Sequence, residues 1–204
     1  MWVTGKKVSN SWAHADEESS VYELKAYVEN IFLRLGLNMR NLVVGNLVDD
    51  IYATALSVQT KGGKRLATFG IVTKKILKAF DIDNEVYYAD LNWKELMKAI
   101  RSVKISYTEI SKFPAVKRDL ALLIDKKVQF AEIEKIAYET EKKLLKEVSL
   151  FDVYEGKNLE AGKKSYAVSF LLQDETQTLN DKMIDKIMSK LVKNLEDKLD
   201  AKLR

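Results

Sequence analysis

Residues 148–173 read VSLFDVYEGKNLEAGKKSYAVSFLLQ, and this stretch decides the fold of the second half of the chain. Both of its ends are rich in β-branched and aromatic residues, which favour strands. A polar connection with a glycine at each end, residues 156–162, separates the two ends. The pattern predicts two strands, Val148–Glu155 and Ser165–Gln173.

The sequence on either side completes a β-α-β-β-α-β order. A strand at Leu120–Asp125 and a helix at Phe130–Lys146 are predicted before the two strands. A longer helix follows at Asp181–Leu199, with Asn180 as its N-cap, and Ala201–Arg204 can add a short strand. This order is the split βαβ arrangement, in which two helices cover one face of a four-stranded sheet. The other face is left bare, and such a face is a common platform for RNA.

The first half of the chain mixes helices with an antiparallel sheet. Ser20 and Glu23 have capping-box spacing before an apolar helical stripe, and Gly36 is a plausible helix end. Adjacent glycines at 62 and 63 predict a hairpin, because they supply the positive φ of a tight turn. The elements predicted after Gly36 are strands Ile51–Thr60, Lys64–Thr73 and Val86–Leu91, and helices Lys74–Phe80 and Trp93–Arg101.

Pro114 is the only proline, and it marks the domain boundary. The residue before a proline is pushed toward extended geometry, which disfavours a helix there. We therefore expect one domain at residues 1–108, a linker at 109–112 and a second domain at 113–204. The expected fold class is α+β.

Composition is that of a globular protein with a buried core. Apolar residues make up 47% of the 204 residues, and no apolar stretch approaches the roughly 18 residues that a membrane span needs. Cysteine is absent, which excludes disulfides and Cys-ligated zinc. We expect a cytoplasmic location and no membrane association. The net charge of +4 permits a nucleic-acid partner without indicating one.

Several sequence blocks resemble the anticodon-binding domain of bacterial phenylalanyl-tRNA synthetase β subunits. They are Phe113–Leu122 (FPAVKRDLAL), Leu150–Gly156 (LFDVYEG) and Gly162–Ser165 (GKKS), with Phe170, Gln173-Asp174 and Thr178-Leu179 downstream. The first half of the chain resembles the end of the catalytic-like domain that precedes the anticodon-binding domain in this family. The residues that carry this resemblance are Gly5, Trp12 and the run from Tyr22 to Gly36. Asp49-Asp50-Ile51-Tyr52 stands where that family has a His-Pro-Gly-Arg-like block.

The resemblance implies a fold, partners and a division of labour. It implies part of a class II synthetase-like antiparallel sheet domain, followed by a ferredoxin-like βαββαβ domain. The family's β subunit is several times longer, so we expect the chain to be a fragment. The implied partners are phenylalanine tRNA and the α subunit, in a heterotetramer of two α and two β chains. The intact enzyme uses ATP and magnesium, and no cofactor is expected in this fragment.

We do not expect catalysis from this chain. A class II site needs a phosphate-clamping arginine on a glycine-rich strand and helix, and the matching element, Val86–Arg101, has no glycine and no suitably placed arginine. In the family, adenylation belongs to the α subunit. His14 and Asp16 suggest a base and its orienting carboxylate, but they lie in a polar stretch without a nucleophile, so a solvated loop is expected.

The candidate RNA-binding residues lie on the predicted bare face. Strand alternation directs Asp152 and Tyr154 to that face, and Phe151 and Val153 to the helices. The tyrosine ring can stack on an unpaired base, and the carboxylate can accept hydrogen bonds from guanine, the first base of the phenylalanine anticodon. Ser165 can add a hydroxyl contact. In the alternative interpretation, Asp152 caps a turn and Tyr154 is edge packing.

Basic residues near this face are candidates for phosphate contacts, which position an RNA without reading its sequence. They are Lys117, Arg118, Lys157, Lys163 and Lys164, and Arg204 is placed to reach a base.

Two further functions stay open on sequence grounds. The fragment can serve subunit assembly alone, or its ferredoxin-like domain can bind an amino acid as a regulator. A regulatory domain more often has a glycine-rich turn after its first strand, and residues 125–128 (DKKV) lack one.

Overall fold

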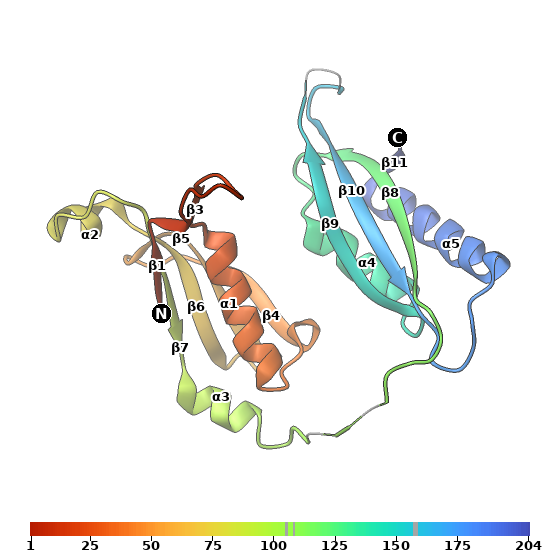
Figure 1. Ribbon diagram of the computed structural model, residues 1–204, viewed down its shortest axis with the longest axis horizontal. Coiled ribbons are helices and arrows are strands. Elements are labelled where there is room, and N and C mark those ends of the chain that lie inside the picture. Colours follow the sequence, from red (N-terminus) through yellow and green to blue (C-terminus); the bar gives the residue numbers. More distant parts are fainter. Residues whose placement is uncertain (105, 108, 157–158) are drawn as a thin grey trace. The chain divides into compact units, whose positions relative to one another are not determined.

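The computed structural model describes residues 1–104, 106–107, 109–156 and 159–204. The chain divides into two compact units, Met1–Tyr107 and Thr108–Arg204 (Figure 1). Each unit has a hydrophobic core of its own. Among the described residues, no helix is both long enough and apolar enough to cross a membrane.

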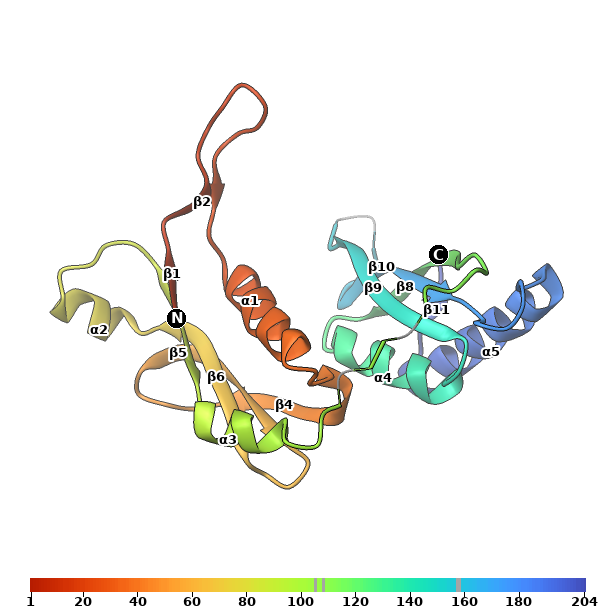
Figure 2. The same cartoon turned by 60° about the horizontal axis from the view of Figure 1, so that its bottom comes forward.

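The first unit is built on a five-stranded antiparallel sheet with the order β1-β7-β6-β5-β4. These strands are β1 (Trp2–Thr4), β4 (Leu42–Leu47), β5 (Tyr52–Thr60), β6 (Arg65–Val72) and β7 (Val86–Leu91). A small ribbon pairs β2 (Lys6–Val8) with β3 (Glu17–Glu18). The helices are α1 (Val21–Arg34), the 3-10 turn η1 (Met39–Asn41), α2 (Lys74–Ala79) and α3 (Trp93–Ala99). Figure 2 shows α1 lying over the sheet.

Local sequence signals account for most of this unit. The Ser20 hydroxyl accepts a hydrogen bond from the Glu23 amide, as the capping box predicts. Gly36 and Gly63 both have positive φ, of 76° and 77°, where the helix end and the hairpin turn were expected. The predicted hairpin is confirmed by the pairing of β5 with β6. Strand β4 was not predicted, because Gly45 and Asn46 interrupt its apolar pattern.

The core of the first unit lies between the sheet and two helices. Helix α1 buries Leu24, Val28 and Phe32, and α3 buries Leu96, all in one cluster with strand residues such as Phe69. Spacings of four residues keep the α1 side chains on one face of the helix. Helices α1 and α3 therefore cover the same face of the sheet.

The second unit has the predicted ferredoxin-like architecture. Its strands are β8 (Val116–Asp125), β9 (Leu145–Tyr154), β10 (Lys163–Leu172) and β11 (Lys202–Leu203), and its helices are α4 (Phe130–Thr140) and α5 (Asp181–Leu199). The sheet order is β11-β8-β10-β9, and every pairing is antiparallel. Strands β8 and β9 therefore run parallel on either side of β10, joined by α4. Both helices lie on one face of the sheet (Figures 1 and 2).

Alternate residues of β10 provide the centre of this core. Tyr166, Val168, Phe170 and Leu172 are buried against apolar residues of both helices. Asn180 accepts a hydrogen bond from the Met183 amide at 3.0 Å and so caps α5 as predicted. The buried residues of α5 are Ile184, Ile187, Leu191 and Leu195. The two helices leave the opposite face of the sheet uncovered, as the fold class implies.

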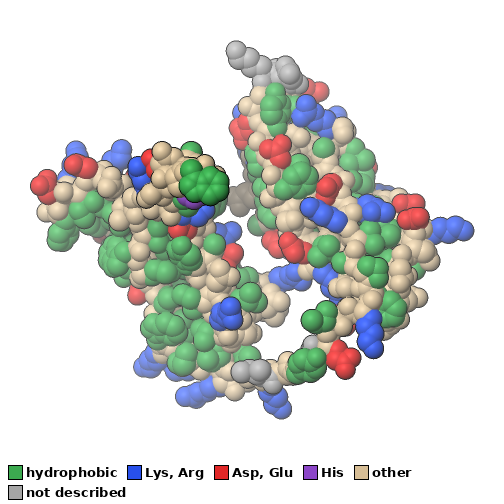
Figure 3. Space-filling model, viewed as in Figure 1, with side chains coloured by type: hydrophobic (Ala, Val, Ile, Leu, Met, Phe, Trp, Pro, Cys, Tyr) green, Lys and Arg blue, Asp and Glu red, His purple; other side chains and the backbone are tan. Residues whose placement is uncertain are grey.

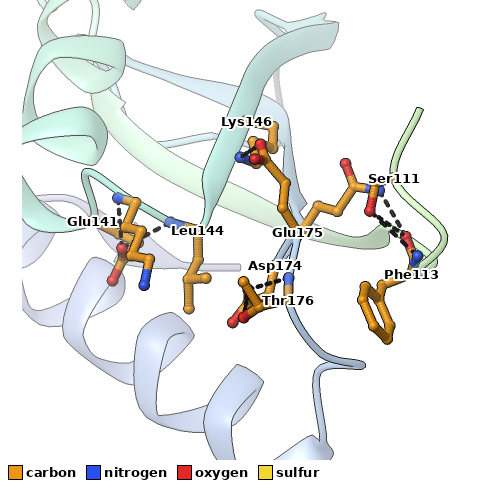
Figure 4. A network of polar contacts seen from close by, with 10 residues as sticks. Ser111, Phe113, Glu141, Leu144, Lys146, Asp174, Glu175 and Thr176 are labelled. Carbon is orange, nitrogen blue, oxygen red and sulfur yellow. Dashed lines mark hydrogen bonds and ion pairs between the residues drawn. The ribbon is translucent and has the colours of Figure 1, made fainter. Parts of the chain in front are cut away.

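Three predicted boundaries of this unit are off by three residues or more: β8 begins at Val116 and not at Leu120, α4 ends at Thr140 and not at Lys146, and β9 begins at Leu145 and not at Val148. The carboxylate of Glu141 accepts hydrogen bonds from the amides of Lys143 and Leu144, at 2.9 and 3.0 Å (Figure 4). These bonds form a tight turn in place of another helical turn. The early end of α4 releases Leu145 and Val148 for the core of the sheet.

Polar contacts also fix the far end of β10. Lys146 pairs with Glu175 at 2.8 Å, which ties the start of β9 to the segment after β10 (Figure 4). In that segment Asp174 accepts hydrogen bonds from the Thr176 hydroxyl and amide and from Gln177. These donors lower the pKa of the Asp174 carboxyl, the Thr176 hydroxyl most of all.

Candidate nucleic-acid interface

Strand register decides which side chains reach the uncovered face of the second unit. Residues that lie opposite each other in an antiparallel pair share a face. Tyr154 lies opposite Ser165, and Asp152 lies opposite Ala167. Ser165 and Ala167 alternate with the buried β10 residues, so all four point away from the helices. Figure 3 shows this face, on which acidic, basic and hydrophobic side chains are interspersed.

A β-bulge at Phe151 sets this arrangement. Leu150 lies opposite Val168 and Asp152 opposite Ala167, so Phe151 has no partner of its own. The extra residue changes the phase of the strand, and bulges commonly re-aim side chains in this way. Before the bulge, Val148 and Leu150 pack on the core; after it, Asp152 and Tyr154 face the open side.

The bulge also corrects the prediction for Phe151. Simple alternation directs Phe151 to the helices, but its side chain is 57% exposed and lies outside the core. The Nζ atom of Lys117 is 5.7 Å from the centre of its ring. Lys117 lies opposite Leu171, on the open face. Phe151 therefore belongs to the open face.

Tyr154 has a cation and a glycine beside its ring. The guanidinium carbon of Arg204 lies 5.2 Å from the centre of the tyrosine ring. The backbone amide of Arg204 donates to the Ala121 carbonyl at 3.0 Å, which extends the β11 pairing and directs this arginine over the open face. The ring of Tyr154 also occupies the space that a Cβ on Gly156 would take. Tyr154 as a whole is 36% exposed.

Asp152 is an available acceptor. Within the described part of the chain, no hydrogen bond or ion pair engages its carboxylate, and the residue is exposed. Its neighbours across the sheet are Ala167 and then Ala121, whose methyl groups leave the face shallow. A planar base edge can therefore approach the carboxylate. Ser165 is only 5% exposed, so its hydroxyl lies at the floor of the site.

The predicted basic residues separate into two groups. Lys117 is on the open face, and Lys163, at the start of β10, pairs with Asp200 at 3.6 Å. Arg118 lies opposite Phe170 on the helix face, where its guanidinium is 3.8 Å from Asp181.

Lys164 also faces the helices. It is 7% exposed, and its Nζ donates to the Tyr166 hydroxyl at 2.7 Å. Strand alternation places Lys164 and Arg118 away from the open face, so neither fits the phosphate-binding role expected of it. The remaining candidate, Lys157, lies outside the described residues.

His14 and Asp16 do not form the pair that their spacing suggests. Asp16 forms an ion pair with Lys6 at 2.6 Å, and the His14 ring lies 3.4 Å from the Ser11 hydroxyl. All four residues lie around the exposed β2–β3 ribbon.

Comparison with known proteins assigns both halves of the chain. The model of the ferredoxin-fold anticodon binding domain matches residues 111–204, and that of the phenylalanyl tRNA synthetase beta chain CLM domain matches residues 1–93. The chain belongs to the phenylalanyl-tRNA synthetase beta-chain family. The resemblance predicted from the sequence blocks and the ferredoxin-like fold are both confirmed.

Curated relatives match the entire chain. It is 90% identical to the phenylalanine–tRNA ligase beta subunit of Bacteroides fragilis, and 89% identical to that of Bacteroides thetaiotaomicron. Identity to the same subunit of Porphyromonas gingivalis is 52%. In all three cases the chain spans about a quarter of the relative's length (25%).

Proposed function

We propose that residues 113–204 bind the anticodon loop of phenylalanine tRNA through the open sheet face, as part of a phenylalanine–tRNA ligase. One observation carries this proposal: Asp152 and Tyr154 lie on the same uncovered face of the sheet. Among the described residues, none forms a hydrogen bond or an ion pair with the Asp152 carboxylate. This pair suits an unpaired base, because the aromatic ring can stack on the face of the base while the carboxylate accepts hydrogen bonds from its edge.

Guanine fits this pair of side chains. Its Watson–Crick edge offers two N–H donors, and a carboxylate can accept from both. The Tyr154 ring supplies a stacking surface for the same base. Arg204, beside the ring, adds a positive charge close to the RNA backbone. The first base of the phenylalanine anticodon is guanine, so Asp152 is the proposed reader of that base.

The rest of the chain supports aminoacylation by another subunit. In this proposal the first unit helps to dock the beta subunit onto its partners and takes no part in the chemistry. The α subunit performs adenylation with ATP and magnesium, in an assembly of two α and two β chains in the cytoplasm. Lys117 and Lys163 contribute positive charge at the edges of the RNA-binding face.

Binding measurements with the 204-residue chain test this proposal. We expect it to bind phenylalanine tRNA more tightly than a transcript whose first anticodon base is adenine, with both affinities falling as salt rises. Asp152→Ala should remove the difference between the two transcripts, which is worth roughly 1–3 kcal/mol for a bidentate contact.

Glu147→Ala is the matched control, because Glu147 lies on the same strand and face, opposite Leu171. It also removes one negative charge and should keep the discrimination. Equal binding of both transcripts by the unmodified chain would show that the open face does not read the anticodon, and would favour a role in subunit assembly alone.

A further inference from the structure

The open face carries a second aromatic ring, that of Phe151, which takes no part in the proposed recognition of guanine. Phe151 is 57% exposed and is aimed at this face by the bulge, three residues before Tyr154. Three residues of strand separate their Cα atoms by about 10 Å, at ~3.3 Å per residue. Asp152 lies between the two rings in sequence. The face thus presents an acceptor flanked by two aromatic plates.

Each ring has a cation beside it. Lys117 Nζ is 5.7 Å from the centre of the Phe151 ring, and the Arg204 guanidinium is 5.2 Å from the centre of the Tyr154 ring. Both distances are within the ~6 Å at which a cation is attracted to a ring face. Lys117 comes from β8 and crosses β10 to reach Phe151 on β9, so the pair spans the sheet. Each pair offers a stacking surface next to a positive charge.

We propose that Phe151 and Lys117 form a second nucleotide position, which takes another unpaired base of the same loop while Tyr154 holds the first. This inference rests on the RNA-binding function proposed above. Phe151 supplies the stacking surface, and the Lys117 ammonium contacts the phosphate that leads to that base. The spacing of about 10 Å requires the two bases to be splayed apart, as unpaired bases in single-stranded RNA often are.

The bulge gives the reason for a phenylalanine at this position. A side chain without a partner residue across the sheet is free of the packing that decides the other positions of β9. The position can therefore carry a large, exposed apolar ring that has the Lys117 ammonium beside it. A phenyl ring has no hydrogen-bonding group, so this position stacks on its base without reading the edge.

The test combines binding with site-specific fluorescence. The phenylalanine anticodon has adenines at its second and third positions, and 2-aminopurine can replace either one; its emission is quenched when it stacks on a ring. Phe151→Ala should weaken binding of the anticodon stem-loop by about 5- to 150-fold and relieve quenching at one of the two positions. Discrimination at the first base should persist, since Asp152 and Tyr154 are intact.

Two further variants separate stacking from packing. Phe151→Leu keeps the apolar bulk without the ring and should lose nearly as much affinity, whereas Phe151→Tyr should bind like the original chain. Val153→Ala is the matched control, because Val153 is 48% exposed on the same strand but lies opposite Tyr166, on the helix face. Lys117→Gln should lower the slope of log affinity against log salt by about 0.7.

The outcomes distinguish this inference from the function on which it rests. If Phe151→Leu binds like the original chain while Tyr154→Ala weakens binding, the second position is refuted and the anticodon-binding function stands. If Val153→Ala and Phe151→Ala weaken binding equally, Phe151 acts through strand packing and the second position is also refuted. If the unmodified chain does not bind the stem-loop, both proposals fail.

Discussion

A methyl group added at Gly156 is the sharpest available perturbation of the proposed RNA site. A Cβ at this position overlaps the hydroxyl and ring carbons of Tyr154, so the ring must leave its present place. Gly156 is not among the glycines with positive φ, so alanine is compatible with its backbone. The substitution therefore acts on the aromatic plate without removing any atom of it.

The expected size follows from the stacking that the ring provides. Stacking of a base on an aromatic side chain is worth roughly 1–3 kcal/mol, or about 5- to 150-fold in the dissociation constant. We expect both Gly156→Ala and Tyr154→Ala to lose much of this affinity. Because both variants remove the same contact, the double variant should bind no more weakly than Tyr154→Ala alone. The coupling energy between Gly156→Ala and Tyr154→Ala is then about as large as the loss of binding energy caused by Gly156→Ala alone.

The assay is a double-mutant cycle, measured by titrating the 204-residue chain and its variants with phenylalanine tRNA at one fixed salt concentration. Gly45→Ala is the control substitution, because a Cβ there meets nothing within 4 Å. Thermal unfolding of each variant shows whether the core is intact; Tyr154 lies outside the core, so only small changes are expected. Additive losses from Gly156→Ala and Tyr154→Ala would refute the reasoning, since independent effects cannot arise from one ring.

Two other predictions concern acid stability and salt dependence. Hydrogen bonds from Thr176 and Gln177 hold the pKa of Asp174 below its usual value, so the stability that they provide is complete above about pH 4 and is lost as the pH falls through the lowered pKa. Asp174→Asn should therefore destabilise the chain at neutral pH and flatten the decline of stability in acid, measured by denaturant unfolding between pH 2 and 7; an unchanged acid profile would contradict this role. Lys164→Ala should cost about 1–3 kcal/mol of stability, because it removes the partner of the buried Tyr166 hydroxyl, and should leave the salt dependence of tRNA binding unchanged. A flatter salt slope for Lys164→Ala would instead indicate a phosphate contact.

The fold of the second unit could be predicted because its local signals agree with each other. Strand patterning, the Asn180 cap and the helical stripe of α5 all favour the same βαββαβ order. The end of α4 could not be predicted in this way, because residues 141–146 suit a helix by composition. The Glu141 side chain overrides that preference by binding two backbone amides.

The candidate site was predictable only in part. The alternation of β10 already indicated that Lys164 shares a face with Tyr166 and Phe170, and this signal was available in the sequence. The bulge at Phe151 left no such signal, since no glycine marks it. Asp152 and Tyr154 were expected on the open face from unbroken alternation. They lie there because the bulge changes the phase of the strand.

That change of phase divides β9 into two segments with different surroundings. Val148 and Leu150 pack on the core, so we expect substitutions there to act on folding, and substitutions at the open-face residues Asp152 and Tyr154 to act on the proposed RNA contact. Loss of Phe151 would leave Leu150 opposite Val168 and Asp152 opposite Ala167, so both segments would keep their faces and only the extra ring would disappear. The length of this strand can therefore change by one residue, adding or removing an exposed aromatic ring, while the core and the neighbouring Asp152 and Tyr154 keep their places.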